Sequence, residues 1–186
     1  SSIHAQVFNA GGVAVGTEFQ VNTTTRNAQN EPNITDLADG GFVITWSDSS
    51  GADEDPGVGI RARIFNASGT PRGNDFHVNF MTEDFQIHPN VTGLANGGFV
   101  VTWQDHSGAV DTSDYGIRAQ IFDATGALVG SEFHVNTYGL DTQSQPVVAG
   151  LPDGVILDQV LIYSASSSVR SVRVAPGTIV FMLILC

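Results

Sequence analysis

Three copies of one motif recur in the chain at a constant spacing of 57 residues: Ile3-His-Ala-Gln-Val-Phe8, Ile60-Arg-Ala-Arg-Ile-Phe65 and Ile117-Arg-Ala-Gln-Ile-Phe122. In each copy apolar residues alternate with other residues, which is the period of a half-buried β-strand. In the second copy this pattern places Arg61 and Arg63 on the outward face. A turn rich in Asn, Asp and Gly follows each copy. The motif therefore predicts three equivalent strands.

The match extends over most of the 57-residue unit without a gap. The same offset aligns a Phe-x-Val-Asn segment at 19–22, 76–79 and 133–136. It also aligns Gln29 with Gln86 and Gln143, Pro32 with Pro89 and Pro146, Leu37 with Leu94 and Leu151, and Gly40 with Gly97 and Gly154. We expect the glutamines to bind backbone groups in a turn. A period of this size indicates a propeller, a solenoid or a pseudo-symmetric β fold.

Each unit contains the pattern of four strands. In the second copy these are residues 60–65, 75–79, 90–94 and 99–103, and the last is a continuous run of β-branched and aromatic residues that predicts the most buried strand. The chain shows no helical periodicity of useful length. We predict an all-β protein of three four-stranded repeat units, propeller-like, with a β-trefoil or β-prism as alternatives. It forms a single domain over 1–186, with units at about 3–59, 60–116 and 117–154.

The phase of the repeat predicts how the ends of the chain meet. The chain opens with the third and fourth strands of a unit and reaches the first strand of another near residue 146. The tail strands are therefore expected to pair with the opening strands and close a ring, which removes exposed sheet edges. Since three blades are fewer than the typical four to eight, a homo-oligomer of two chains is the alternative route to a ring.

The repeat ends at Gly154 and leaves a divergent closing segment, 155–186. Ile156 and Val160 stand where the repeat predicts Phe and Trp. Three interpretations stay open: a specialised closing segment or oligomer interface, a diverged last unit, or a stretch displaced by a frameshift. We expect residues 155–163 to form a strand in the place of 99–103, and residues 179–185 to be buried.

Composition excludes several classes of function. The formal charge is −12, from nineteen acidic and seven basic residues, and so acidic a surface repels the phosphates of nucleic acids. The longest apolar run, 178–185, is too short to span a membrane. The chain contains no Gly-x-Ser-x-Gly elbow, no His-Glu-x-x-His motif and no phosphate-binding glycine loop. We therefore predict no enzymatic activity and no nucleic-acid partner.

Acidic linkers between strands are the candidate metal sites. Calcium binds about six to eight oxygen atoms, which carboxylates and carbonyls on a flexible loop can supply. The linkers after the two tryptophans hold such residues among glycines, and the predicted ligands are Asp48, Asp53 and Asp55 in the first and Asp105, Asp111 and Asp114 in the second. The alternative interpretation is an exposed acidic loop that only keeps the protein soluble.

The repeat also resembles a known family. Its pattern reads Gly-x-Glu-Phe-x-Val-Asn-Thr, Gln-x-x-Pro-x-Val-x-x-Leu-x-Asp-Gly-Gly-Phe-Val-Val-Thr-Trp and Gly-Ile-x-Ala-Gln-x-Phe, and over residues 3–154 it resembles the tandem repeats of large exported bacterial calcium-binding proteins of the hemolysin-type or adhesin-like kind. The resemblance implies a secreted or cell-surface location, a propeller-like β array and a calcium-linked role without catalysis. It carries the family's acidic linker onto the same six aspartates. The tail departs from the family, and the glycine-aspartate nonapeptides of hemolysin-type β-rolls are absent.

Three functions follow as hypotheses. The first is a secreted, non-enzymatic, calcium-binding interaction module with a carbohydrate or cell-surface ligand. The second is a lectin with one shallow sugar site per repeat, where exposed aromatic rings beside the acidic loops stack on sugars. The third is a structural spacer of an adhesin.

Overall fold

A computed structural model describes residues 1–52, 57–108, 115–136, 143–150 and, for the backbone, 181–184. Within these ranges every regular element is a β-strand, which confirms the all-β prediction. The strands are β1 (His4–Phe8), β2 (Ala14–Gln20), β3 (Gln29–Asp36), β4 (Phe42–Asp48), β5 (Gly59–Phe65), β6 (Phe76–His77), β7 (Gln86–Gly93), β8 (Phe99–Asp105), β9 (Gly116–Phe122), β10 (Leu128–His134), β11 (Val147–Gly150) and β12 (Phe181–Ile184). No helix long and apolar enough to cross a membrane occurs in this part of the chain.

Two complete four-stranded antiparallel sheets form the centre of the molecule. Their strand orders are β3-β4-β5-β6 and β7-β8-β9-β10, so each sheet is a simple meander. The register repeats as well, since Trp46 lies opposite Arg61 and Trp103 lies opposite Arg118. Four-stranded sheets thus recur with the 57-residue repeat. They run from β3 to β6 and from β7 to β10, so they cross the unit boundaries that the sequence analysis placed at about residues 59 and 116.

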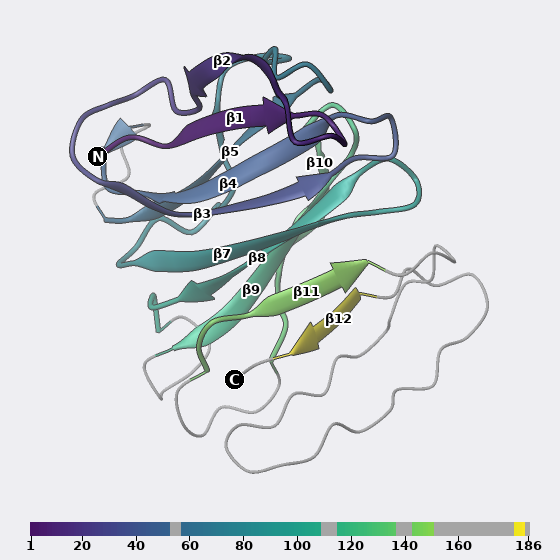
Figure 1. Ribbon diagram of the computed structural model, residues 1–186. Helices are drawn as coiled ribbons and strands as arrows, with labels where there is room; N and C mark the ends of the chain where they lie inside the picture. The colour runs from purple at the N-terminus through teal and green to yellow at the C-terminus, as the bar shows by residue number, and fades with distance from the viewer. Residues whose placement is uncertain (53–56, 109–114, 137–142, 151–180, 185–186) are drawn as a thin grey trace.

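The sheets are stacked, with the pair β1-β2 at one end of the stack and the pair β11-β12 at the other (Figure 1). The first strand of each sheet is joined by hydrogen bonds to the first strand of the next. The backbone N–H groups of Val91 and Gly93 on β7 donate to the side chains of Asn33 and Thr35 on β3. Those of Val148 and Gly150 on β11 donate to the side chains of Asn90 and Thr92 on β7. The first strands β3, β7 and β11 therefore lie side by side and set the spacing of the units.

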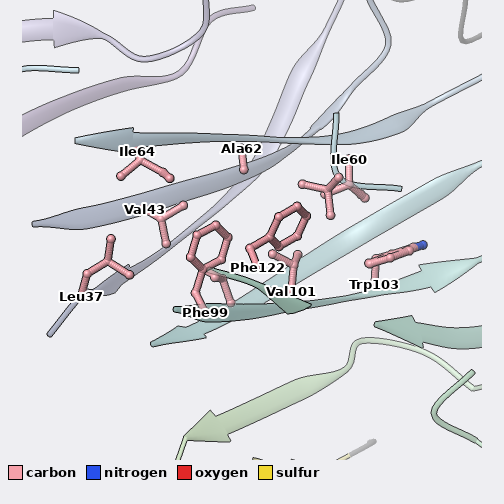
Figure 2. Packing of buried hydrophobic residues seen from close by; sticks show 11 residues of the cluster. Leu37, Val43, Ile60, Ala62, Ile64, Phe99, Val101, Trp103 and Phe122 are labelled. Atoms are coloured by element: carbon pink, nitrogen blue, oxygen red, sulfur yellow. The ribbon is translucent and has the colours of Figure 1, made fainter. Parts of the chain in front are cut away.

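The largest hydrophobic cluster fills the space between the two complete sheets. The first sheet contributes Leu37, Val43 and Ile64, and the second contributes Phe99 and Phe122, whose rings stack with centroids 5.0 Å apart (Figure 2). Because each sheet also packs on a neighbour across its other face, β8 is buried along its whole length, as the sequence predicted for this strand.

In the part of the chain that the structure describes, the tail strands do not pair with the opening strands, so the predicted closure of a ring within one chain is not found there. The opening strands β1-β2 and the tail strands β11-β12 form two separate two-stranded sheets. Two complete sheets lie between them in the stack, and the tail strand β11 packs on β7 and β8 instead. The propeller-like arrangement therefore remains a prediction, while the antiparallel repeat sheets are established.

The tail supplies a second strand to its unit from an unexpected position. Gly150 pairs with Phe181, as Asp36 pairs with Phe42 and Gly93 with Phe99. The place that the sequence assigned to residues 155–163 is therefore occupied by β12. Residues 155–163 themselves, and the side chains of 179–185, lie outside the described part of the structure.

Candidate functional site

Asp48 lies at the end of β4, where its side chain is buried and surrounded by donors. Its Oδ1 accepts hydrogen bonds from Gln29 Nε2 and from the Ser50 backbone N–H, both at 3.0 Å. Its Oδ2 accepts one from Ser50 Oγ at 2.7 Å and lies 3.8 Å from Arg61 Nε. The whole side chain is only 5% exposed, so the carboxylate depends on these donors in place of water.

Asp105 repeats this environment at the end of β8. Gln86 Nε2 and the Ser107 N–H each donate to Oδ1 at 3.2 Å. Oδ2 accepts hydrogen bonds from Ser107 Oγ at 2.8 Å and from Arg118 Nε at 2.6 Å. An ionised carboxylate offers about four lone-pair positions, and here four donors occupy them.

Arg61, on the third strand of the first sheet, lies between the carboxylate of Asp48 and a second carboxylate. Arg61 donates to Asp75 at 3.0 Å, and Asp75 accepts two further hydrogen bonds, from the N–H of Thr23 at 2.7 Å and from its hydroxyl at 2.9 Å. Thr23 follows β2 and so belongs to the preceding unit. In the second unit the corresponding groups are Arg118, Glu132 and the N–H of Phe80, with distances of 2.8 and 2.6 Å.

An asparagine and a glutamine complete the connection between units. The Ile60 N–H donates to Asn79 Oδ1 at 2.7 Å, and Asn79 Nδ2 donates to Gln86 Oε1 at 3.0 Å. Gln86, on β7 of the next sheet, donates to Asp105 on the neighbouring strand β8 and also to the Glu83 carbonyl, as the sequence predicted for a turn. We call this set the inter-unit relay: Asn79, Gln86, Asp105, Arg118 and Glu132 at one junction, and Asn22, Gln29, Asp48, Arg61 and Asp75 at the junction before it.

The relay stabilises the ionised form of Asp105. Burial alone would raise the pKa of Asp105, but the hydrogen bonds from Arg118, Ser107 and Gln86 and the charge of Arg118 together hold the pKa below its ordinary value of 3.8. The charged form is thus stabilised by the groups that bind it. Such a network is costly to break, because any partner that is removed leaves a buried polar group unsatisfied.

These contacts bear on the predicted calcium ligands. Asp48 and Asp105 lie in different units, and each is occupied by donors from its own unit, so a cation would have to displace those donors. Within the described ranges no group of three or more His, Cys, Asp or Glu side chains is placed to hold a metal ion. The remaining predicted ligands, Asp53, Asp55, Asp111 and Asp114, lie outside the described residues. Calcium binding by the linkers therefore stays a prediction.

Arginine in the relay was missed by the sequence analysis. The alternation in residues 60–65 predicted that Arg61 points to solvent, but Arg61 is only 7% exposed. That prediction assumed one solvated sheet face, whereas both faces of β5 are covered. The signal that could have identified the role of arginine was its recurrence at 61 and 118, in step with Asp48 and Asp105.

One cluster of side chains breaks the repeat at the same end of the sheets. The ring of His106 contacts the rings of both Phe85 and Tyr115. Its centroid lies 6.3 Å from that of Phe85 and 3.8 Å from that of Tyr115. The first unit has Ala28, Ser49 and Val58 at these positions. Phe85 is 48% exposed, so the second unit alone of the two complete units presents an aromatic surface here.

Comparison with known proteins leaves the family open. No protein-family model matches the chain, and no curated protein matches it. Among solved structures the chain is similar to a mutant of the NanB sialidase from Streptococcus pneumoniae, with 12% sequence identity and a TM-score of 0.47. The match covers 77% of this chain and 21% of the sialidase chain, and at this level it carries no argument about activity.

Proposed function

We propose that this chain is a non-enzymatic repeat module with a structural role, a rigid spacer of the kind found in exported adhesins. The inter-unit relay carries this proposal. In the part of the chain that the structure describes, the polar side chains of the relay are buried, and they bind one another and the neighbouring unit. A group that acts on a substrate has to be reachable by it.

The relay suits a spacer because it couples neighbouring sheets. A repeat unit cannot bury its hydrophobic face alone, and stacking creates the continuous core. Hydrophobic contact alone tolerates small slips between sheets. The hydrogen bonds of Asn79 and Gln86 fix the register of one unit against the next, which makes the array stiff.

Two tryptophans, one in each complete sheet, allow this coupling to be measured. With Trp46→Phe the fluorescence reports the second sheet, and with Trp103→Phe it reports the first. We expect both single-tryptophan proteins to unfold at the same urea concentration. Adding Gln86→Ala, which removes one buried hydrogen bond from Asn79 and one from Asp105 at a cost of about 1–3 kcal/mol, should separate the two midpoints.

Gln29→Ala is the matched control, because it removes the same contact at the junction before the first sheet. It should lower stability without separating the two sheets from each other. Midpoints that already differ before Gln86 is changed, or that stay together after the change, contradict a relay that couples the units.

A second function is favoured by the aromatic cluster of Phe85, His106 and Tyr115. We propose that this surface binds a carbohydrate, since flat rings with a polar edge suit the apolar face of a sugar ring. The site would belong to the second unit rather than to every repeat. Retention on a panel of immobilised sugars tests it: Phe85→Ala should abolish retention, while Leu128→Ala, a change at another exposed apolar residue, should leave it intact. A protein that no sugar retains contradicts this second function.

A further inference from the structure

The loop 80–85 lies between β6 and β7 and is held at both of its ends by the inter-unit relay. Asn79, just before the loop, donates to Gln86, just after it, at 3.0 Å. Gln86 donates in turn to the Glu83 carbonyl within the loop. The loop 23–28, one repeat earlier, is held by the same two contacts. The relay therefore fixes the ends of both loops, while the side chains between those ends differ.

Aromatic side chains are exposed at both ends of the later loop. Phe80 is 84% exposed and Phe85 is 48% exposed. The earlier loop has Thr23 and Ala28 at these positions. The backbone N–H of Phe80 donates to Glu132 at 2.6 Å, so the more exposed ring is carried by an anchored position. Single exposed apolar residues are common, but two on one short loop form a surface that usually has a partner.

The charge of the loop changes together with its aromatic content. Glu83 and Asp84 stand where the earlier loop has Arg26 and Asn27. Both acidic residues are exposed, and in the described part of the chain neither carboxylate has a hydrogen-bond or ion-pair partner. The loop therefore places unpaired negative charge between two exposed rings, and both features favour a cationic ligand.

A buried amide beside the aromatic cluster indicates a ligand that donates hydrogen bonds. Gln104 is 5% exposed, and its Nε2 lies 2.9 Å from Nε2 of His106. Its Oε1 is buried and has no hydrogen-bond partner among the described residues. A buried acceptor without a donor is costly, and ammonium and hydroxyl groups are donors that can satisfy it. At the same position of the first unit, Ser47 donates to Glu31.

We propose that this surface binds an oligosaccharide of amino sugars whose amines are free and positively charged. The inference rests on the carbohydrate-binding function proposed for the aromatic cluster, and it adds the adjoining loop to that site. Phe80 and Phe85 offer two stacking positions for the apolar faces of two sugar rings. Glu83 and Asp84 pair with the ammonium groups, and Gln104 accepts a hydrogen bond from an ammonium or hydroxyl group. An acidic sugar is repelled by the same carboxylates and by the net charge of −12.

Calorimetric titration with glucosamine oligosaccharides tests the inference, with the same oligosaccharides after N-acetylation as the matched ligand. At about pH 6 the free amines are protonated, and the free-amine form should bind about tenfold more tightly than the acetylated form. Added salt should reduce this difference because it screens the charges. Equal or tighter binding of the acetylated form overturns the inference and leaves the carbohydrate function standing. If neither form binds, the inference fails, and the sugar panel then decides whether the carbohydrate function fails with it.

Single variants locate the charge that the ligand meets. Asp84→Asn should weaken binding of the free-amine form and leave binding of the acetylated form unchanged, and Asn tolerates the positive φ of 63° at this position. Phe80→Ala should weaken binding of both forms. Asp123→Asn is the matched control, because it removes the same charge from an exposed turn, and it should bind as the wild type does. A loss that is equal in Asp84→Asn and Asp123→Asn would mean that net charge alone attracts the amine, and it overturns the site.

Discussion

At the residue scale, the buried aspartates show how far a sequence pattern determines a role. The repetition of Asp48 and Asp105 correctly marks them as important positions. Their role could not be assigned from spacing alone, because carboxylates among glycines serve a cation and an arginine equally well. The sheet pairing places Arg61 and Arg118 opposite the tryptophans, where they contact these aspartates.

The first prediction concerns Asp105→Asn. The change removes the charge that pairs with Arg118 in a buried setting, so we expect a loss of about 3 kcal/mol in the free energy of unfolding. Because the donors to Asp105 come from the protein, this loss should be the same in calcium and in chelator. Urea unfolding under both conditions measures it.

Asp123→Asn is the control for this comparison, since Asp123 is an exposed turn residue and should change stability equally little in both solutions. A loss that appears only in calcium would show that Asp105 is a ligand and would support the calcium-binding hypothesis over the relay.

At the scale of elements, the strands and their turns were predictable and the packing of sheets was not. Alternation and β-branched runs identify strands because they reflect local burial. The contact between first strands depends on the distance between sheets, which no local pattern encodes. In the sequence, this contact is marked only by glycines at positions 93 and 150, where the first unit has Asp36. The difference can be interpreted only when the stacking of the sheets is known.

The second prediction tests that stacking through Gly93→Ala. The new methyl group meets the Asp36 backbone, which cannot move without separating β3 from β7, so we expect a loss of about 1–3 kcal/mol. Gly73→Ala is the matched control, because a Cβ there meets nothing within 4 Å, and its effect should stay within about 0.5 kcal/mol. Thermal unfolding of both variants measures the difference. Equal effects of the two changes would contradict a close approach at Gly93.

At the scale of the whole molecule, the 57-residue period was readable from the sequence but the closure was not. The sequence predicted three four-stranded units, and the described residues form two complete sheets and two two-stranded pairs. A gapless period counts units, yet the rotation from one sheet to the next is set by side-chain packing across each junction. With only two complete sheets the two half-sheets end up at opposite ends of the stack (Figure 1). Residues 155–186 follow no repeat, so the pairing of β12 with β11 had no signal in the sequence.

The third prediction concerns the pH dependence of stability, in which two effects oppose each other. Protonation of exposed carboxylates relieves the repulsion among nineteen acidic residues, so stability should rise as the pH falls from 7 toward about 4. At lower pH, Asp105 in the relay and Asp39, which pairs with Arg72 at the surface, begin to lose their charge. The pKa of Asp105 lies below 3.8, and the hydrogen bond from Arg72 lowers the pKa of Asp39 to about 2.

Both groups have a folded-state pKa below the unfolded value, so the stability they contribute is present above about pH 4 and is lost as the pH falls through the folded pKa. We therefore expect a maximum near pH 4 to 5 and a steep acid limb, measured as urea midpoints across the range. Asp105→Asn removes one of the titrating groups and should flatten the fall of stability in acid. Adding 1 M salt should flatten the rise of stability from pH 7 toward pH 4, because salt screens repulsion at the surface far more than it screens a buried pair. Stability that is highest at pH 7 and falls steadily with acid would mean that buried ionic contacts, rather than net charge, govern the molecule over the whole range.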